Sequence, residues 1–194
     1  MKLFIDVETI PIERPDFPIN PIGPKKIETA WKNTALDSAY GELVCVGYAL
    51  GDDVPHVVVR DFSQEHSEAE LLRSFFSVIP PTIPVFVGHN VSFDLKFLAH
   101  RSMIHRVKPA TKIPHTASAW SGKYIDTMFE WGGANHYVGL MELCRVLGVG
   151  PNDEDIDGAS VWEYVARGDL ETVARHCALD VERTRAVYRA MNYA

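Results

Sequence analysis

The run Lys2-Leu3-Phe4-Ile5-Asp6-Val7-Glu8-Thr9 lies near the start of a chain of 194 residues. Its apolar and β-favouring residues predict a buried strand that ends in two carboxylates. Side chains two residues apart share one face of a strand, so Asp6 and Glu8 point the same way. Their repulsion at roughly 5 Å would cost about 3 kcal/mol at an effective dielectric constant near 20. A hard divalent cation such as Mg²⁺ or Mn²⁺ would relieve it, and a solvated acidic turn is the simpler alternative.

The composition is that of a globular protein. With 46% hydrophobic and 23% charged residues, residues 1–194 are expected to form one domain. The net charge of -7 argues against a protein that coats duplex nucleic acid through bulk positive charge. Three scattered cysteines suit neither a disulfide framework nor a zinc site, so a reducing cytoplasm is the expected location. No apolar run approaches the roughly 18 residues of a membrane span, and no membrane partner is expected.

Hydrophobic periodicity predicts an α/β fold with three strands first. A proline-rich loop at 11–24 and a short helix at 25–36 follow the first strand. Strands at 43–50 and 54–62 then form a hairpin around Gly51-Asp52-Asp53. The later elements are a helix from Ser67 to Pro80, a strand at 85–87, a helix from about residue 93, a short strand at 124–128, and helices at 140–147, 160–167 and from Asp169 to Met191. The acidic loop at 152–158 lacks the final glutamate of a calcium loop, which favours a solvated loop.

A third carboxylate, Asp94, follows the strand at 85–87, in the first turns of the next helix. The side chains of Asn90 and Ser92 could cap that helix. A carboxylate is also electrostatically favourable near a helix N-terminus. Asp94 therefore has a structural explanation beside a catalytic one.

The segment between Asp94 and Asp126 contains no acidic residue. Its six cations leave a formal charge of -13 on the rest of the chain, since the net charge is -7. They are Lys96, Arg101, Arg106, Lys108, Lys112 and Lys123. This asymmetry predicts a face that meets an anion, most simply a phosphodiester backbone, with Arg106, Lys108 and Lys112 as candidate contacts. The alternative is a solvated loop that offsets an acidic surface.

On the last helix, His176 and Asp180 are four residues apart and share one face. Such a pair is often only a surface contact. Its significance comes from the three carboxylates that precede it in the chain, because with them it completes a set of four carboxylates and one histidine.

The order of these motifs resembles the DEDD superfamily of 3′ to 5′ exonucleases, whose proofreading-type domain has a ribonuclease H-like fold. Residues 6–9 (DVET), 88–94 (GHNVSFD) and 176–184 (HCALDVERT) are similar to its three motifs. Residues 25–43, 120–128 and 161–188 look most like the stand-alone exonucleases related to the proofreading domain of family B DNA polymerases. One feature departs from the pattern, because the subgroup with a spacing of four before the last aspartate normally carries tyrosine where this chain has His176.

The resemblance implies roles for the site residues. Asp6 would bridge two divalent cations, Mg²⁺ or Mn²⁺, Glu8 and Asp180 would hold the ion on the nucleophile side, and Asp94 would hold the other partly through water. His176 would take the proton from the attacking water. Thr9 and Ile10 would meet the terminal nucleotide, and Asn90 and Phe93 are further candidates for contact.

These observations predict a mixed five-stranded sheet with its first three strands antiparallel and helices on both faces. The expected activity is metal-dependent 3′ to 5′ exonucleolysis of single-stranded DNA or RNA with release of nucleoside 5′-monophosphates. An endonuclease of the same fold would need an open groove. A catalytically silent nucleic-acid-binding module or assembly subunit is disfavoured, because retained carboxylates without metal would only repel one another. Protein partners and the choice between DNA and RNA stay open.

Overall fold

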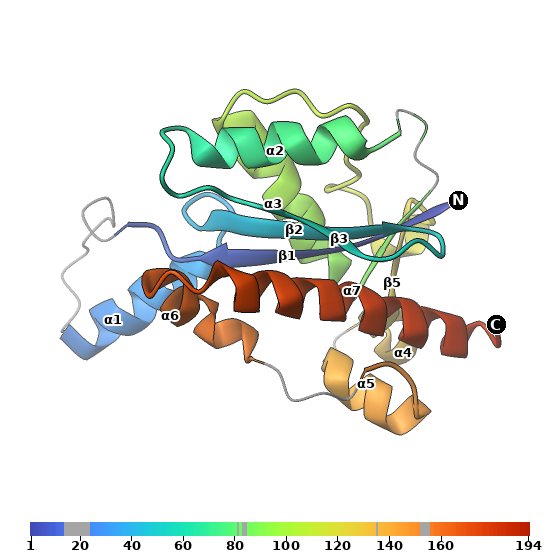
Figure 1. Cartoon of the computed structure of the whole chain (residues 1–194). Helices are drawn as coiled ribbons and strands as arrows, with labels where there is room; N and C mark the ends of the chain where they lie inside the picture. The colour runs from blue at the N-terminus through green and yellow to red at the C-terminus, as the bar shows by residue number, and fades with distance from the viewer. Residues whose placement is uncertain (14–23, 81, 83–84, 135, 152–155) are drawn as a thin grey trace.

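The computed structural model describes residues 1–13, 24–80, 82, 85–134, 136–151 and 156–194. Five strands form one mixed sheet in the order β3-β2-β1-β4-β5, with helices on both faces (Figure 1). The strands are β1 (Lys2–Ile10), β2 (Glu42–Leu50), β3 (His56–Val59), β4 (Val85–Gly88) and β5 (Tyr124–Asp126). β2 pairs antiparallel with both β1 and β3, whereas β4 pairs parallel with β1 and β5. The predicted α/β fold, including its three antiparallel strands, is confirmed.

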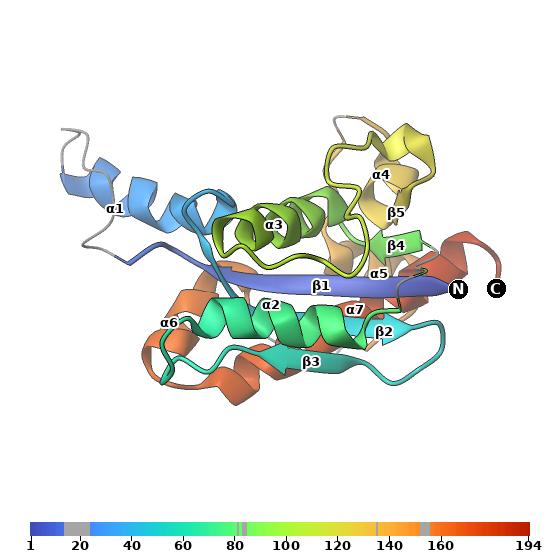
Figure 2. The same ribbon diagram turned by 90° about the horizontal axis from the view of Figure 1, so that it is seen from above.

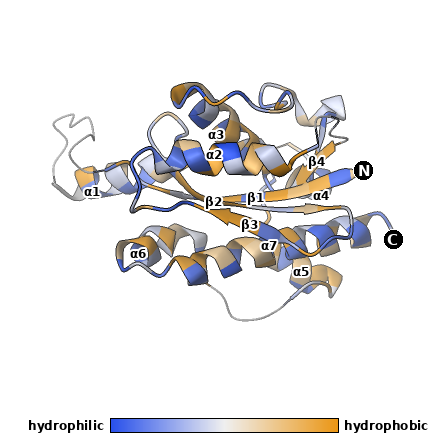
Figure 3. Cartoon of the chain, turned by 45° about the horizontal axis from the view of Figure 1, so that its top comes forward, coloured by the Kyte–Doolittle hydropathy of each residue, from blue (hydrophilic) through white to orange (hydrophobic). Residues whose placement is uncertain are grey.

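Two helical layers cover the sheet. On one face, α2 (Ser67–Val78) lies over β2 and β3, and α3 (Val91–Ile104) lies beside it over β1 and β4 (Figure 2). The opposite face carries α7 (Leu170–Met191), with α5 (Leu140–Leu147) and α6 (Val161–Ala166) nearby (Figure 1). Figure 3 shows α2 and α7 carrying both hydrophilic and hydrophobic residues, as expected for helices that bury one face. The remaining helices are α1 (Pro24–Asn33), α4 (Thr127–Gly132) and the short 3₁₀ turns η2 (Thr34–Leu36), η3 (Ala119–Ser121) and η4 (Gly158–Ser160).

Alternation along β1 divides its side chains between the two layers. Leu3, Ile5 and Val7 enter the core cluster beneath α2 and α3. Phe4 packs instead with Val181 of α7. Because the period of a strand is two, the carboxylates of β1 fall on the face of Phe4, where α7 packs.

Two predicted strands have other bounds in the structure. β3 is shorter than the predicted 54–62, since Pro55 has no N–H for a strand ladder. Met128 lies in α4 instead of a strand, because Asp126 accepts its N–H and begins the helix there. Residues 14–23 of the predicted proline-rich loop and 152–155 of the acidic loop lie outside the described residues.

Cys45, Cys144 and Cys177 are free and buried. In the part of the chain that the structure describes, no helix is both long enough and apolar enough to span a membrane.

A buried ion pair joins α2 to α3. Arg101 donates from Nε and Nη2 to the two carboxylate oxygens of Glu68, at 2.7 Å each, and the Glu68 side chain is only 2% exposed. His105 Nε2 lies 2.9 Å from the same carboxylate, which also accepts the N–H of Leu43 at 3.0 Å. Arg101 is one of the six cations of the acid-free segment. Because it is buried in this ion pair, it does not contact an anion from outside.

Glu68→Ala is expected to lower the free energy of unfolding at pH 7 by about 3–5 kcal/mol, because it leaves the Arg101 charge buried without its partner. Burial alone would raise the pKa of the Glu68 carboxyl, but the hydrogen bond and charge of Arg101 outweigh it, and the pKa lies below its usual value. A lowered folded pKa stabilises the protein above the unfolded value, near 4, and this contribution is lost as pH falls through the folded value. The difference between parent and variant should therefore shrink below about pH 4.

Urea unfolding from pH 3 to 8 measures this effect. Glu70→Ala is the matched control, because the Glu70 ion pair with Arg73 is exposed and such pairs contribute about 1 kcal/mol or less. Equal stability of the two variants at pH 7 would contradict a structural role for the buried pair.

Candidate active site

The four carboxylates and the histidine singled out from the sequence meet in one hollow of about 750 Å³. It is bounded by the second half of β1, the start of α3, the loop before α5 and the middle of α7. Asp6, Glu8, Asp94, Asp180 and His176 all line it. The carboxylates thus come from three elements that are distant in sequence.

The carboxylate of Asp6 has few hydrogen-bond donors to stabilise its negative charge among the described residues. Its Oδ2 atom is buried and has no hydrogen-bond partner among the described residues. Burial raises the pKa of Asp6 well above its usual value, and the charges of Asp180 and Asp94 raise it further. A buried oxygen without a partner is a place where a cation would be stabilised.

Gly47 of β2 lies opposite Asp6 in the pairing of β1 with β2. It allows α7 to approach the sheet closely at this point. A Cβ atom at Gly47 would lie 2.8 Å from Sγ of Cys177 and 3.0 Å from a methyl group of Val181. Glycine is therefore required for this close packing. Because α7 lies so near the sheet, its side chains reach the carboxylates of β1.

Asp94 bridges α3 and β1. It accepts the N–H of Val7 at 2.9 Å, and its side chain is almost fully buried. Burial raises the pKa of Asp94 well above its usual value, and the charges of Asp126 and Asp180 raise it further. The hydrogen bonds from its own N–H and from the N–H of Val7 lower the pKa, but by less. These two hydrogen bonds fix the orientation of the Asp94 carboxylate, but backbone N–H groups bring no net positive charge to it.

The prediction that side chains cap α3 is wrong. Asn90 has a left-handed backbone, with φ of 57°, and no side-chain capping hydrogen bond is made there. Its N–H instead donates to Oδ1 of Asp126 at 2.9 Å. Asp126 also accepts from the N–H groups of Met128 and Phe129, so this buried aspartate holds the starts of α3 and α4 together. Asp126 could have been recognised from the sequence, because it is an aspartate at the end of a strand.

His176 is buried beside two of the carboxylates. Its Nε2 atom lies 3.2 Å from Oε1 of Glu8 and 4.0 Å from Oδ2 of Asp180. His89 lines the same hollow, but Nε2 donates to the carbonyl of Val138 at 2.8 Å and Nδ1 lies 2.9 Å from Oγ1 of Thr127. Burial lowers the pKa of His89. The imidazole of His176 is therefore the one placed among the carboxylates.

Arg183 is a site residue that the sequence analysis missed. Its side chain is 1% exposed, and Nη1 donates to Oδ1 of Asp180 at 2.7 Å while Nε donates to the carbonyl of Pro151 at 3.2 Å. The guanidinium therefore fixes the orientation of the Asp180 carboxylate. The available signal was the i, i+3 spacing of Asp180 and Arg183 on one helix.

The donor set fits divalent cations that prefer oxygen, since Glu8, Asp94 and Asp180 line the same hollow as the orphan Oδ2 of Asp6. Among the described residues, however, no group of three or more His, Cys, Asp or Glu side chains stands ready to hold a metal ion. Glu8 faces His176, and Asp180 is bonded to Arg183. These carboxylates would have to turn toward Asp6 to share a cation.

The predicted substrate contacts fall in three places. Asn90 and Phe93 line the hollow. Thr9 donates its hydroxyl to the carbonyl of Ala35 at 2.7 Å, just after a register shift in β1, and Ile10 packs on a core cluster, so neither lines it. Arg106, Lys108 and Lys112 surround a different hollow at the far end of α3. Contact with substrate stays a prediction for each of these residues.

Residues 34–194 match a family model described as a predicted 3′-5′ exonuclease related to the exonuclease domain of PolB. The chain is also 28% identical over 170 residues to an uncharacterized protein of Methanocaldococcus jannaschii, which covers 82% of this chain and 91% of that protein. In structure it is similar to the family B DNA polymerase from the hyperthermophilic archaeon Pyrobaculum calidifontis, with a TM-score of 0.63 and 18% identity. That similarity covers 97% of this chain but only 24% of the polymerase chain, and it concerns the fold alone.

Proposed function

Because the chain belongs to the family of predicted 3′-5′ exonucleases related to the exonuclease domain of PolB, we propose that it is a metal-dependent 3′ to 5′ exonuclease. It hydrolyses phosphodiester bonds at the 3′ end of single-stranded DNA or RNA and releases nucleoside 5′-monophosphates. The observation that carries this proposal is the convergence of four carboxylates and His176 on one hollow. Residues 1–194 would act as a single exonuclease domain.

Asp6, Glu8, Asp94 and Asp180 would hold two divalent cations, Mg²⁺ or Mn²⁺. Bound there, the ions would supply positive charge that activates water and neutralises the leaving 3′ oxygen. Asp94 is held by the N–H of Val7, so little conformational entropy would be lost at this carboxylate, whereas Glu8 and Asp180 would have to turn toward Asp6.

His176 would take the proton of the attacking water at Nε2. In the structure this nitrogen lies 3.2 Å from Oε1 of Glu8, where an attacking water would have to be. It can accept the proton of that water only when Glu8 turns away from it. The position of Glu8 therefore decides whether His176 can act as a base.

Two substrates separate the candidate functions. A linear single strand labelled at its 5′ end and a circular single strand are incubated with Mn²⁺. An exonuclease shortens the linear strand one nucleotide at a time from its 3′ end and leaves the circle intact. Cleavage of the circle would identify an endonuclease, and binding without cleavage of either substrate would identify a silent module. The same assay on DNA and RNA oligomers with free or blocked 3′ ends decides the substrate class.

A further inference from the structure

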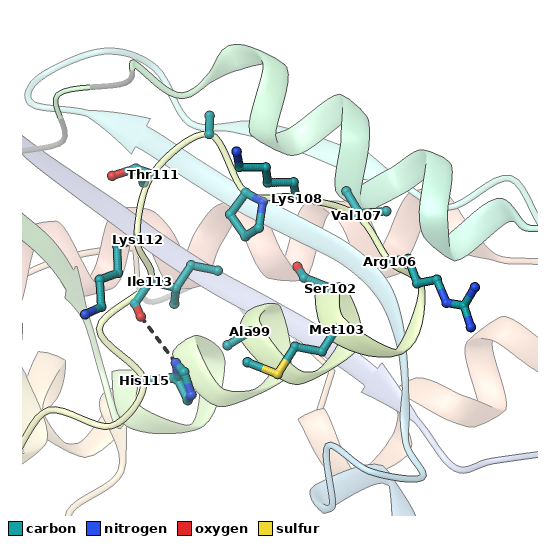
Figure 4. Close-up of a pocket in the computed structure, with 12 residues that line it drawn as sticks. Ala99, Ser102, Met103, Arg106, Val107, Lys108, Thr111, Lys112, Ile113 and His115 are labelled. Atoms are coloured by element: carbon teal, nitrogen blue, oxygen red, sulfur yellow. Dashed lines mark hydrogen bonds between the residues drawn. The ribbon is translucent and has the colours of Figure 1, made fainter.

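A second hollow lies at the carboxyl-terminal end of α3, away from the carboxylates. Its volume is about 670 Å³, and none of its lining residues also lines the carboxylate hollow. Figure 4 shows it enclosed between α3 and the segment that follows. Ala99, Met103, Val107 and Ile113 give it an apolar wall. A volume between about 300 and 1,000 Å³ is typical of sites for small organic groups.

Three cations surround this apolar wall. Arg106, Lys108 and Lys112 line the hollow, and their side chains extend from separate points of the enclosing segment (Figure 4). No Asp or Glu occurs in residues 95–125 to pair with them locally. The described residues form no ion pair with any of the three, whereas Arg101 of the same segment is paired with Glu68. An apolar wall with a cationic rim suits a group that is flat and apolar but attached to an anion.

A continuous face of α3 links the two hollows. Phe93, Lys96, His100 and Met103 follow one another at spacings of three or four residues, so they share one side of the helix. A small hollow of about 210 Å³ shares Asn90 and Phe93 with the carboxylate hollow and is also lined by Lys96.

The same face then reaches the apolar hollow through two histidines. The ring of His100 lies 5.5 Å from that of His115, and His115 lines the apolar hollow. The carboxylate hollow, the small hollow and the apolar hollow therefore follow one another along α3.

We propose that this face of α3 holds the substrate strand upstream of the scissile bond, with an unpaired base in the apolar hollow and its phosphates on Arg106, Lys108 and Lys112. The inference rests on the proposed function and adds the path of the strand and the length of strand that the protein senses. Bases supply the flat apolar face and phosphates the charge, which is how proteins hold single strands without reading their sequence. From Asp94 to Met103 the helix rises about 13 Å, or roughly four nucleotides at the spacing of a stacked strand.

The test compares the affinities of DNA oligomers of two to twelve nucleotides for the full chain, measured by fluorescence anisotropy with Ca²⁺ at several salt concentrations. For the parent, affinity should rise steeply between about two and six nucleotides. Replacing Arg106, Lys108 and Lys112 together by alanine should lower the ratio of twelve-nucleotide to two-nucleotide affinity by about tenfold and reduce the salt slope by about 2. The matched control replaces Lys26, Arg73 and Arg175, three exposed cations on α1, α2 and α7 that do not line the apolar hollow, and should keep both the ratio and the slope.

A pair of single variants tests the apolar wall. Met103 and Ile104 are adjacent and both exposed, but only Met103 lines the hollow. Met103→Glu should therefore lower the affinity for the long oligomer, whereas Ile104→Glu should not.

Failure of this inference and failure of the proposed function are distinguishable. If the parent digests 3′ ends but the triple variant and Met103→Glu keep the parent's length dependence and salt slope, the inference is overturned and the exonuclease stands. If length-dependent binding is lost as expected in these variants while no protein cleaves any strand, the binding path stands and the exonuclease fails.

Discussion

Each of the variants Asp6→Ala, Glu8→Ala, Asp94→Ala and Asp180→Ala is expected to lose divalent-dependent hydrolysis by about 10³-fold or more. A catalytic metal ion contributes several kcal/mol to the transition state, and each 1.4 kcal/mol corresponds to a factor of ten in rate. Asp6 should show the largest loss, because its buried Oδ2 has no partner among the described residues. Single-turnover cleavage of a labelled strand in Mn²⁺ measures the rates, and titration calorimetry with Mn²⁺ measures metal binding separately.

The same variants should fold. Removal of the Asp6 charge relieves repulsion among the carboxylates, so the free energy of unfolding of Asp6→Ala without divalent cations should stay equal or rise. Asp94→Ala and Asp180→Ala should be somewhat less stable than the parent, because they remove the acceptors of the Val7 N–H and of the buried Arg183 guanidinium. Asp94→Asn is the sharpest case, because its amide oxygen can still accept the N–H of Val7 while the charge is lost. Glu171→Ala, which removes an exposed carboxylate from α7, is the matched control and should keep full activity. Full activity in any two of the four alanine variants would rule out the proposed set of ligands.

His176→Ala is expected to lower the single-turnover rate by roughly 10²-fold or more, since a positioned base contributes about 10²–10⁴ in rate. Binding of Mn²⁺ should be largely kept, because the carboxylates remain. In the parent, activity should fall toward acid, because a protonated imidazole cannot accept a further proton. The alanine variant should lose this dependence.

His176→Tyr tests the departure from the family pattern. The spacing of four residues before Asp180 already suits tyrosine, so partial activity with an altered acid limb is expected. The rates of parent, alanine and tyrosine proteins are compared from about pH 5 to 9 in Mn²⁺. A parent-like rate and profile in His176→Ala would leave His176 as a packing residue. His89 would not be the natural substitute, because both of its ring nitrogens are engaged by Thr127 and Val138.

Local patterns were enough to predict most strands and helices, and the resemblance to a known family added the order of the sheet. The strand period predicted that Asp6 and Glu8 share one face of β1, and both side chains line the same hollow. The predicted bounds of the helix at 140–147 and the predicted start of the last helix at Asp169 agree with the structure. These features depend on backbone geometry over a few residues, which a sequence displays directly.

Charge compensation could not be predicted in this way, because the partners are far apart in the chain. Glu68 looked like an ordinary acidic residue in a first helical turn until packing of α2 on α3 buried it against Arg101, 33 residues later. Asn90 looked like a capping residue, but a left-handed backbone turns its N–H toward Asp126. In both cases burial decides the partner, since a polar group removed from water must find one wherever the fold provides it.

The sequence by itself thus supplied the acidic residues, the histidine and the elements that carry them, because strand and helix periods follow from local geometry. Tertiary structure alone decided how these groups are oriented: Gly47 admits α7 to the sheet, Arg183 turns Asp180, and Glu8 faces His176. It also separated Arg106, Lys108 and Lys112 from Arg101, which the sequence grouped as one basic segment. The physical reason is that packing fixes which charges lose their water and which stay exposed, and this depends on contacts between elements that no local pattern contains.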